Sequence, residues 1–266
     1  MIRIALTIAG SDPSGGAGLQ ADLRTFAAFG VYGCAVVTAM TVQNTQRVLS
    51  ARIVPPGFVR EQLDHLLADV RPHAAKTGML GTASIVGEVA RAVARHRLPN
   101  LVVDPVMRAK DGSALLDEKG ALVLKEKLLP LAALATPNAF EAAALSGVEV
   151  ETLDDAKRAA EKLLAIGCRA VLIKGGHLRR EKGQVVDLFY DGSFRRFAHR
   201  ARRGEVHGTG CVLSAAIAAS LAKGRSLIEA VGEGHEFLSR GLARAQKVGH
   251  GRRCITVCRW RQRRPP

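Results

Sequence analysis

The sequence has no long apolar run, few aromatic residues and no paired cysteines, and each absence excludes a class of protein. No stretch approaches the roughly 18 consecutive apolar residues that a membrane-spanning helix needs, so we expect no membrane contact. The apolar run that opens the chain ends at Gly10 and is too short for a signal peptide. The five cysteines include no Cys-x-x-Cys pair, which disfavours a zinc site or a disulfide framework. We therefore expect a cytoplasmic protein.

The formal net charge of +15 suggests nucleic-acid binding, but its distribution argues against it. Seven basic and no acidic residues lie between Lys247 and the end of the chain, so much of the excess belongs to the tail. A second basic group lies at 195–203, where a positive field would attract a nucleotide polyanion. Aromatic residues make up only 4% and do not alternate with the basic runs, so base stacking has little support. We expect small-molecule partners and no nucleic acid.

Short apolar segments alternate with amphipathic stretches along almost the whole chain, as in a doubly wound α/β fold. The apolar segments are continuous, which is typical of parallel strands buried on both faces. The pattern predicts strands at 3–9, 34–39, 73–77, 100–104, 132–136, 169–174 and 185–190. It predicts helices at 17–29, 57–70, 83–96, 118–129, 138–146, 153–166, 211–223 and 226–246. We expect one α/β domain, 1–251, with a mostly parallel central sheet between helices, and a basic atypical tail, 252–266.

The most informative stretch is a glycine-rich loop that opens an alanine-rich apolar helix. It consists of His207, Gly208, Thr209, Gly210 and Cys211. Its glycines permit a tight turn, and the first amides of the helix are unpaired donors in a region of partial positive charge. This combination predicts an anion site, for which phosphate is the usual ligand. The same field is expected to lower the pKa of the Cys211 thiol and make it a candidate base in phosphoryl transfer.

Polar side chains follow other predicted strands, where ligands of such sheets bind. Asp104 ends one strand, and a carboxylate there is suited either to hold Mg²⁺ with phosphate oxygens or to cap the next element. Asn138 and Glu141 follow another strand; they share a helical face and also fit a capping box, so both interpretations stay open. Lys174 ends a buried strand beside two glycines, which favours a phosphate or nucleotide contact. The amide of Gln43 can recognise a heterocycle through paired donors and acceptors.

Together these segments resemble the bifunctional hydroxymethylpyrimidine/phosphomethylpyrimidine kinases of thiamine biosynthesis, members of the ribokinase-like superfamily. The matching segments follow in order at 6–23, 32–45, 76–79, 104–107, 136–142, 174–177 and 207–211. The set is specific, although no single motif is. The resemblance implies ATP- and Mg²⁺-dependent phosphorylation of 4-amino-5-hydroxymethyl-2-methylpyrimidine and then of its monophosphate, by a ribokinase-like fold that commonly forms homodimers.

The resemblance also implies a role for each matching residue. The residues that would surround the pyrimidine are Gly10, Asp22, Gln43, Met79 and Val106. Asp22 and Gln43 would hydrogen-bond its amino group and ring nitrogen. The residues that would position Mg²⁺ and the nucleotide are Asp104, Glu141, Asn138, Lys174 and His207. Cys211 would be the base, where most of the superfamily has aspartate, with the amides of Gly208, Thr209 and Gly210 beside the transferring phosphoryl group.

Two segments depart from the family pattern. Glu205 and Val206 stand where relatives usually have Asn-Thr, and Glu205 brings a negative charge toward the expected ATP phosphates. The residues after 249–251 look unrelated to the usual end of the family. We expect a loosely packed tail, so that deletion of 253–266 leaves kinase activity intact.

Two other functions remain open. A pyridoxal kinase of the same cysteine-bearing type would also phosphorylate a hydroxymethyl group on a nitrogen-containing ring, and Gln43, Met79 and Val106 do not separate the two. A catalytically idle relative could instead sense a pyrimidine or nucleotide, with its basic tail on nucleic acid. This second alternative is less favoured, because the catalytic set is present together.

Overall fold

In the part of the chain that the structure describes, nine strands form the central sheet, and three short strands form a smaller sheet. The computed structural model describes residues 2–109, 112–178, 183–200 and 204–256. The strands of the central sheet are Ile4–Ser11 (β1), Tyr32–Gln43 (β2), Val48–Ile53 (β3), Ala74–Thr77 (β4), Leu101–Val103 (β5), Leu134–Ala135 (β6), Val171–Ile173 (β7), Gln184–Tyr190 (β8) and Phe194–Arg200 (β9). The α-helices are Gly18–Ala28 (α1), Pro56–Asp69 (α2), Ala83–Arg95 (α3), Glu118–Val123 (α4), Ala139–Ser146 (α5), Leu153–Ala165 (α6), Thr209–Ala222 (α7) and Leu227–Ala243 (α8).

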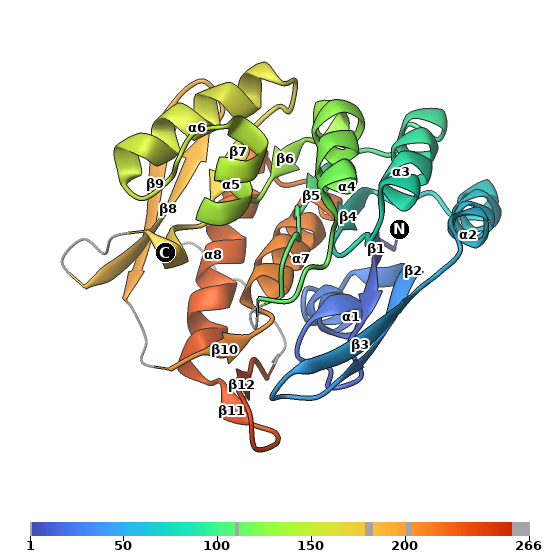
Figure 1. Cartoon of the computed structure of the whole chain (residues 1–266), viewed down its shortest axis with the longest axis horizontal. Coiled ribbons are helices and arrows are strands. Elements are labelled where there is room, and N and C mark those ends of the chain that lie inside the picture. The colour runs from blue at the N-terminus through green and yellow to red at the C-terminus, as the bar shows by residue number, and fades with distance from the viewer. Residues whose placement is uncertain (1, 110–111, 179–182, 201–203, 257–266) are drawn as a thin grey trace.

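The strand order confirms the predicted α/β fold with a mostly parallel sheet. The order is β3-β2-β1-β4-β5-β6-β7-β8-β9. Neighbours from β2 through β7 pair in parallel, whereas β3, β8 and β9 pair antiparallel at the two edges. Figure 1 shows α2, α3, α4, α5 and α6 along one side of the sheet and α1, α7 and α8 along the other. None of the described helices is long and apolar enough to cross a membrane.

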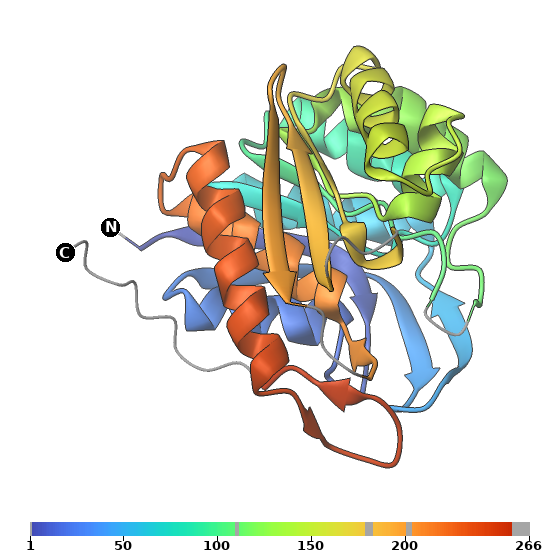
Figure 2. The ribbon, with the colours of Figure 1, turned by 90° about the vertical axis from the view of Figure 1, so that its left-hand side faces the viewer.

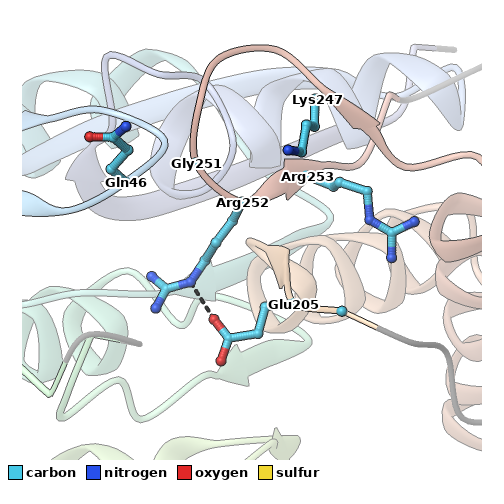
Figure 3. Close-up of a pocket in the computed structure, with 7 residues that line it drawn as sticks. Gln46, Glu205, Lys247, Gly251, Arg252 and Arg253 are labelled. Carbon is cyan, nitrogen blue, oxygen red and sulfur yellow. Dashed lines mark hydrogen bonds and ion pairs between the residues drawn. The ribbon is translucent and has the colours of Figure 1, made fainter.

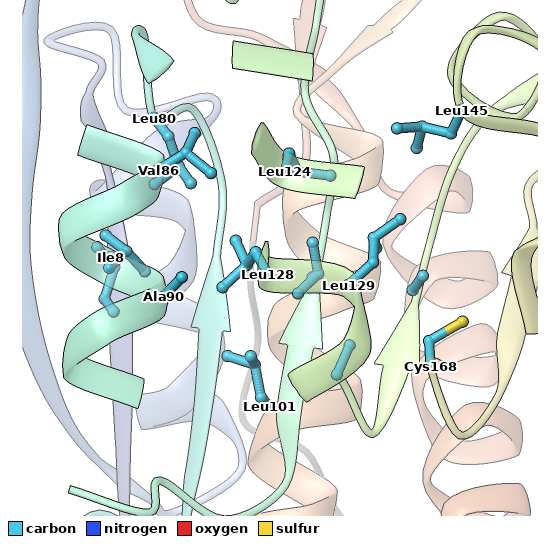
Figure 4. Close-up of a cluster of buried hydrophobic side chains, with 14 of the residues drawn as sticks. Ile8, Leu80, Val86, Ala90, Leu101, Leu124, Leu128, Leu129, Leu145 and Cys168 are labelled. Carbon is cyan, nitrogen blue, oxygen red and sulfur yellow. The ribbon is translucent and has the colours of Figure 1, made fainter. Parts of the chain in front are cut away.

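The core has two layers because successive side chains of a buried strand point to opposite faces. Leu101 and Val103 of β5 pack in one hydrophobic cluster, while Val102 packs in the other. The first cluster fills the space beneath α3 and the turns that follow α4, where Leu128 and Leu129 lie beside Leu101 (Figure 4). Because both faces of β5 are buried, its side chains are apolar at every position and not only at every second one.

Helix α7 lies inside the second layer and is apolar on all sides. Every residue from Val212 to Ala222 is buried. Such a helix is fixed by packing along its whole length rather than along one stripe. It packs against α8 and α1, and Figure 2 shows it behind α8 and close to the sheet. Its first turn is therefore held rigidly against the sheet edge.

Helices α1, α2 and α7 lack the side-chain N-cap that the other described α-helices have, and α1 and α7 are the two that begin at glycine-rich loops. The residues whose side chains accept a bond from the first turn of a helix are Thr82, Asp117, Asn138, Thr152 and Ser226. No side chain caps α1 after Ala17 or α7 after Gly208. The first amides of these two helices are thus available to a ligand.

The predicted elements match the observed ones except at edges and ends. All seven predicted strands and all eight predicted helices are present, but the three short strands of the smaller sheet were missed, as were β3 and β9 of the central sheet. Both are edge strands, and β9 carries exposed arginines in place of a buried apolar run. The predicted helix 118–129 is α-helical only over α4 and continues as a π-helical turn, Leu124–Leu128. The predicted helix 226–246 ends at Ala243.

The expectation of a loosely packed tail from residue 252 is wrong for residues 252–256. Arg253–Cys254 (β12) pairs in parallel with Val206–His207 (β10) and antiparallel with Gln246–Lys247 (β11). Ile255 is buried and packs against α8, where a Cβ on Gly241 would lie 2.7 Å from Ile255 Cγ2. This segment therefore holds the strand that leads into the phosphate loop. The rest of the predicted tail, 257–266, lies outside the described residues.

We expect Ile255→Ala to lower the free energy of unfolding by about 2–5 kcal/mol, because it removes buried apolar volume beside α8. For the same reason, deletion of 253–266 is now expected to destabilise the chain. Urea denaturation measures both. Val248→Ala is the control: its side chain is 65% exposed, and substitution should cost less than about 0.5 kcal/mol. An Ile255→Ala effect as small as that of the control would contradict the packing of this segment.

Candidate active site

The predicted site residues gather where parallel strands end at one edge of the sheet. Gly10 lies near the end of β1, Asp104 follows β5, Asn138 follows β6 and Lys174 follows β7. Asn138 and Lys174 form a parallel bridge, so the ends of β6 and β7 are adjacent. Carboxyl ends of parallel strands meet at the same edge, where α/β folds bind ligands. The structure thus places these residues at one edge, as the sequence predicted.

The phosphate loop is held against the first glycine-rich segment by a contact that only glycine permits. Gly208 has φ +74°, and a Cβ there would lie 1.8 Å from the carbonyl oxygen of Gly16. This contact brings the starts of α1 and α7 together, and the amide of Gly18 donates to Cys211 Sγ. Two uncapped helix N-termini therefore converge on the thiol, where both dipoles favour negative charge.

Beneath the thiol lies a fully buried ion pair. Lys76 Nζ donates to Asp22 Oδ2 at 2.7 Å, and Thr7 Oγ1 donates to the same oxygen at 2.7 Å. Both charged side chains are 0% exposed. Burial lowers the pKa of Lys76, but the Asp22 carboxylate, Cys211 and Asp104 raise it overall, so the ammonium stays charged. Lys76 is thus a cation close to Cys211, as is Lys174, and the sequence did not predict the interaction of Lys76 with this thiol.

The direct pyrimidine contact expected for Asp22 does not fit this geometry. One carboxylate oxygen is bonded to Lys76 and Thr7, and the other, Oδ1, is buried without a hydrogen-bond partner in the described structure. Burial raises the pKa of Asp22 despite Lys76. Asp22 therefore lies below the site, where it is bonded to Lys76.

The predicted lowering of the Cys211 pKa is wrong in direction. Burial raises the pKa of this thiol to about 11, although Lys76 and the Gly18 amide act to lower it. The free-energy cost of removing the thiolate from water is larger here than the stabilisation that it gains from the Gly18 amide and the Lys76 ammonium. The free chain thus holds Cys211 mainly as the thiol at neutral pH.

A second charged cluster joins Asp104, Lys174 and Glu141. Lys174 Nζ donates to Asp104 Oδ1 at 2.7 Å and lies 3.7 Å from Glu141 Oε2. Burial and the nearby Asp104 raise the pKa of Glu141 to about 7, although Lys174 lowers it. Ser214 Oγ contacts the other Asp104 oxygen at 3.3 Å, and a Cβ on Gly210 would lie 3.3 Å from Lys174 Nζ. The start of α7 therefore touches this cluster directly.

Asn138 and Glu141 form the capping box that was one of the two interpretations. Asn138 Oδ1 accepts from the Glu141 amide at 2.9 Å, and Glu141 Oε2 accepts from the Asn138 amide at 2.8 Å. The cap fixes the Glu141 carboxylate beside Lys174. The cap occupies the Asn138 side-chain oxygen, so capping of α5 is enough to explain why asparagine stands at this position.

The chemistry of this cluster fits a Mg²⁺ ion. Asp104 and Glu141 are nearly completely buried, and one ammonium ion faces two carboxylates. The raised pKa of Glu141 shows that the second negative charge lacks full compensation. Mg²⁺ prefers one or two carboxylates together with phosphate oxygens. These two side chains are the ones that would hold it.

His207 connects the phosphate loop to the end of β1 and to Gln43. His207 Nε2 lies 2.8 Å from Asp12 Oδ2 and 3.0 Å from Gln43 Nε2. Asp12 also accepts bonds from the Ala17 and Ser14 amides, at 2.9 Å each, which orders the turn before α1. Asp12 is therefore a positioning residue, and the sequence did not single it out.

The expected pyrimidine contacts lie beside this connection. A Cβ on Gly10 would lie 3.1 Å from Met79 Sδ, so these two residues are in contact. Gln43 is half-buried and lies at the end of β2. Val106 is also half-buried and follows Asp104, to whose carbonyl oxygen its amide donates at 2.9 Å.

The charge that Glu205 was expected to bring toward ATP is compensated. Its carboxylate pairs with the Arg252 guanidinium across a hollow of about 450 Å³ (Figure 3). Lys247 and Arg253 also line this hollow. The segment that follows the predicted domain end therefore neutralises the unusual residue before the phosphate loop.

Comparison with known proteins identifies the family of the chain. A family model described as phosphomethylpyrimidine kinase matches residues 12–256. The chain belongs to the phosphomethylpyrimidine kinase family. The match includes β12, in keeping with its place in the fold.

Individual members of the family are similar over nearly the whole chain. The hydroxymethylpyrimidine/phosphomethylpyrimidine kinase of Escherichia coli (strain K12) is 46% identical over 93% of this chain and 94% of its own length. The phosphomethylpyrimidine kinase of Clostridium difficile 630 superposes with a TM-score of 0.80 and 38% identity, covering 90% of this chain and 99% of that one. An ADP complex of Bacillus subtilis pyridoxal kinase superposes with a TM-score of 0.89 and 36% identity, covering 97% and 98%.

We expect Gly208→Ala to lower kcat/KM by about 100-fold or more, because the new methyl group forces α7 away from Gly16 and displaces Cys211. Steady-state phosphorylation of the pyrimidine measures the loss. Gly224→Ala is the matched control: its φ is +84°, but a Cβ there would meet no atom within 4 Å. It should cost only about 1–2 kcal/mol of stability. Equal activity of the two variants would contradict the loop contact.

Proposed function

We propose that the chain transfers the γ-phosphoryl group of ATP to 4-amino-5-hydroxymethyl-2-methylpyrimidine and then phosphorylates the monophosphate to the diphosphate. The observation that carries this proposal is the juxtaposition of two units at one sheet edge. One is the Cys211 thiol beneath two uncapped helix N-termini, and the other is the Asp104–Lys174–Glu141 cluster. A kinase site needs this pairing of an acceptor-binding group with a group that binds phosphates and metal.

The pyrimidine would lie between the ends of β1, β2 and β4. Gly10 and Met79 offer a flat, apolar contact, since the absence of a side chain at Gly10 lets a ring approach the backbone. Gln43 offers an amide that recognises ring nitrogens and an exocyclic amino group. Val106 would close the opposite side. The hydroxymethyl group would then point toward Cys211.

The nucleotide phosphates would lie over the start of α7. The amides of Gly208, Thr209, Gly210 and Cys211 donate to phosphoryl oxygens, and Lys174 contributes a positive charge. Asp104 and Glu141 would hold Mg²⁺, which when bound neutralises the charge on the β- and γ-phosphate oxygens. His207 supports this loop through Asp12. A loose transition state depends mainly on such positioning and charge stabilisation.

Cys211 would act as the base in its thiolate form. The thiolate takes the hydroxyl proton while the substrate oxygen bonds to phosphorus and the bond to ADP breaks. Lys76 and the Gly18 amide stabilise the thiolate before the transfer. Because burial raises the thiol pKa to about 11, the reactive form is a minor one at neutral pH.

The rate should therefore rise with pH in a way that depends on Cys211. With a thiol pKa of about 11, the thiolate fraction grows about tenfold for each pH unit below that value. We expect kcat for the free pyrimidine to increase from about pH 7 to about pH 10 in the wild type, and to be low and nearly flat in Cys211→Ala. A Cys211→Ala variant with wild-type turnover and intact substrate affinity would show that the helix amides act alone.

The need for Mg²⁺ should also depend on pH through Glu141. Its pKa of about 7 means that the side chain is a neutral acid below this pH and a carboxylate ligand above it. We expect the Mg²⁺ concentration for half-maximal rate to fall between about pH 6 and about pH 8 in the wild type. Glu141→Gln should raise that concentration by about tenfold or more at about pH 8. In this variant the Mg²⁺ requirement should no longer fall between about pH 6 and about pH 8. An unchanged Mg²⁺ requirement in Glu141→Gln would contradict the assignment.

Pyridoxal phosphorylation is a second candidate, because the pyridoxal kinase neighbour covers 97% of this chain with a TM-score of 0.89. One assay separates the two: ATP consumption and phosphorylated products are followed with the free pyrimidine and with pyridoxal. We expect kcat/KM for the pyrimidine to exceed that for pyridoxal, with the monophosphate and then the diphosphate as products. A preference for pyridoxal would reverse the assignment, and no turnover of either would favour a binding protein.

We also propose that the chain acts in the cytoplasm as a homodimer. Exposed apolar side chains gather on the edge formed by β2 and β3, where Met40, Val42 and Leu49 are 57%, 52% and 68% exposed. Such a patch is typical of an interaction surface. Sedimentation equilibrium of the wild type and of Leu49→Lys tests the dimer.

A further inference from the structure

A cluster of metal-binding side chains lies where β8, β9 and α8 meet, apart from the residues assigned to catalysis. Asp187 belongs to β8, His199 to β9 and His235 to α8. One ligand atom from each lies within 4.8 Å of the other two. Figure 2 shows α8 lying alongside the hairpin of β8 and β9. The cluster therefore joins three elements of the fold.

The fold places the three side chains on facing surfaces. Asp187 pairs with Phe197 across the hairpin, and His199 is two residues beyond Phe197, so all three point to the same side. Helix α8 covers that side at Gly232, where a Cβ would lie 3.8 Å from the Phe197 ring. His235, three residues further along, lies on the same face of the helix.

The distances suit a tetrahedral transition-metal site. His199 Nδ1 lies 3.1 Å from His235 Nε2, and His235 Nε2 lies 4.0 Å from Asp187 Oδ2. Metal–ligand bonds of about 2.0–2.1 Å at tetrahedral angles require ligand atoms about 3.3 Å apart. Small side-chain shifts would therefore bring all three atoms into the coordination shell of one ion.

The surroundings shield the cluster from solvent. Both histidines are half-buried, and their rings lie 5.0 Å apart. The Phe197 ring lies 5.7 Å from the His235 ring and adds an apolar wall. Asp187 is buried, and its Oδ1 accepts from the Gly175 amide at 2.8 Å, which leaves Oδ2 directed toward His235. A bound cation would compensate this buried carboxylate.

We propose that Asp187, His199 and His235 bind a divalent transition metal, with Zn²⁺ as the preferred ion and water as the fourth ligand. Two imidazoles and one carboxylate are a common ligand set for zinc, whereas Mg²⁺ prefers oxygen ligands. The site is thus distinct in chemistry from Asp104 and Glu141. Because Asp187 also bonds to the residue after Lys174, the metal would tie the β8–β9 hairpin and α8 to the loop that positions Lys174.

Zinc titration of the purified chain tests the proposal, with calorimetry to measure affinity and stoichiometry. The titration uses a Cys211→Ser background, so that zinc bound by the catalytic thiol does not contribute. We expect one tight equivalent in this background, and at least a tenfold weaker affinity after His199→Gln or His235→Gln. His96→Gln is the matched control, because His96 pairs with Asp64 at 3.2 Å on the surface, and it should leave the affinity unchanged.

Thermal unfolding gives a second readout that does not depend on activity. Zinc should raise the Tm of the Cys211→Ser chain and of His96→Gln, and should leave the Tm of His199→Gln and His235→Gln unchanged. Cobalt(II) added to the Cys211→Ser chain, which keeps both His199 and His235, should give the visible absorption of a tetrahedral site. No tight zinc equivalent, or equal zinc affinity and Tm shifts in all the variants, would overturn the proposal.

Discussion

The close contact between the Gly16 and Gly208 backbones is the constraint on which the site depends. A Cβ at Gly208 would lie 1.8 Å from the Gly16 carbonyl oxygen, and a Cβ at Gly16 would lie 2.3 Å from His207 Cδ2, so the two loops meet only because both positions are glycine. This contact aligns the starts of α1 and α7 and directs the Gly18 amide to Cys211. Because α7 is buried from Val212 onward, the packing of the core fixes the position of the thiol. Catalytic geometry and core stability are thus coupled through one helix.

The charges around this contact are costly to bury and are arranged for ligands that the free chain does not contain. Lys76 and Asp22 are paired away from water, yet Asp22 Oδ1 has no partner in the described structure. Next to them, Lys174 faces two carboxylates, and Glu141 keeps a raised pKa. Buried ion pairs contribute little net stability. Under the proposed function they lie beside the pyrimidine and phosphate sites, and we infer that the cost of burying them serves binding and catalysis.

The central sheet and its helices were predictable because strands buried on both faces require continuous apolar sequence. The edges were not: β9 is rich in arginine, and β10 to β12 are two-residue strands from distant segments that leave no periodic pattern. The residues at the strand ends were found from their motifs. Asp12 was missed because its contact with His207 spans 195 residues of the chain, and the pairing of Lys76 with Asp22, 54 residues away, was not predicted for the same reason. The pKa of Cys211 was predicted in the wrong direction because a helix start is visible in sequence and the extent of burial is not.

The central claim is that Cys211 is a half-buried thiol whose surroundings raise its pKa, and that its ionised form faces the acceptor hydroxyl. Its alkylation by iodoacetamide, followed by mass spectrometry as a function of pH with and without the pyrimidine, tests this most directly. With a thiol pKa of about 11, the alkylation rate should still be climbing at about pH 10, and the bound pyrimidine should block it. A rate that levels off near the ordinary thiol pKa of about 8.5, or labelling that the pyrimidine does not affect, would contradict the account.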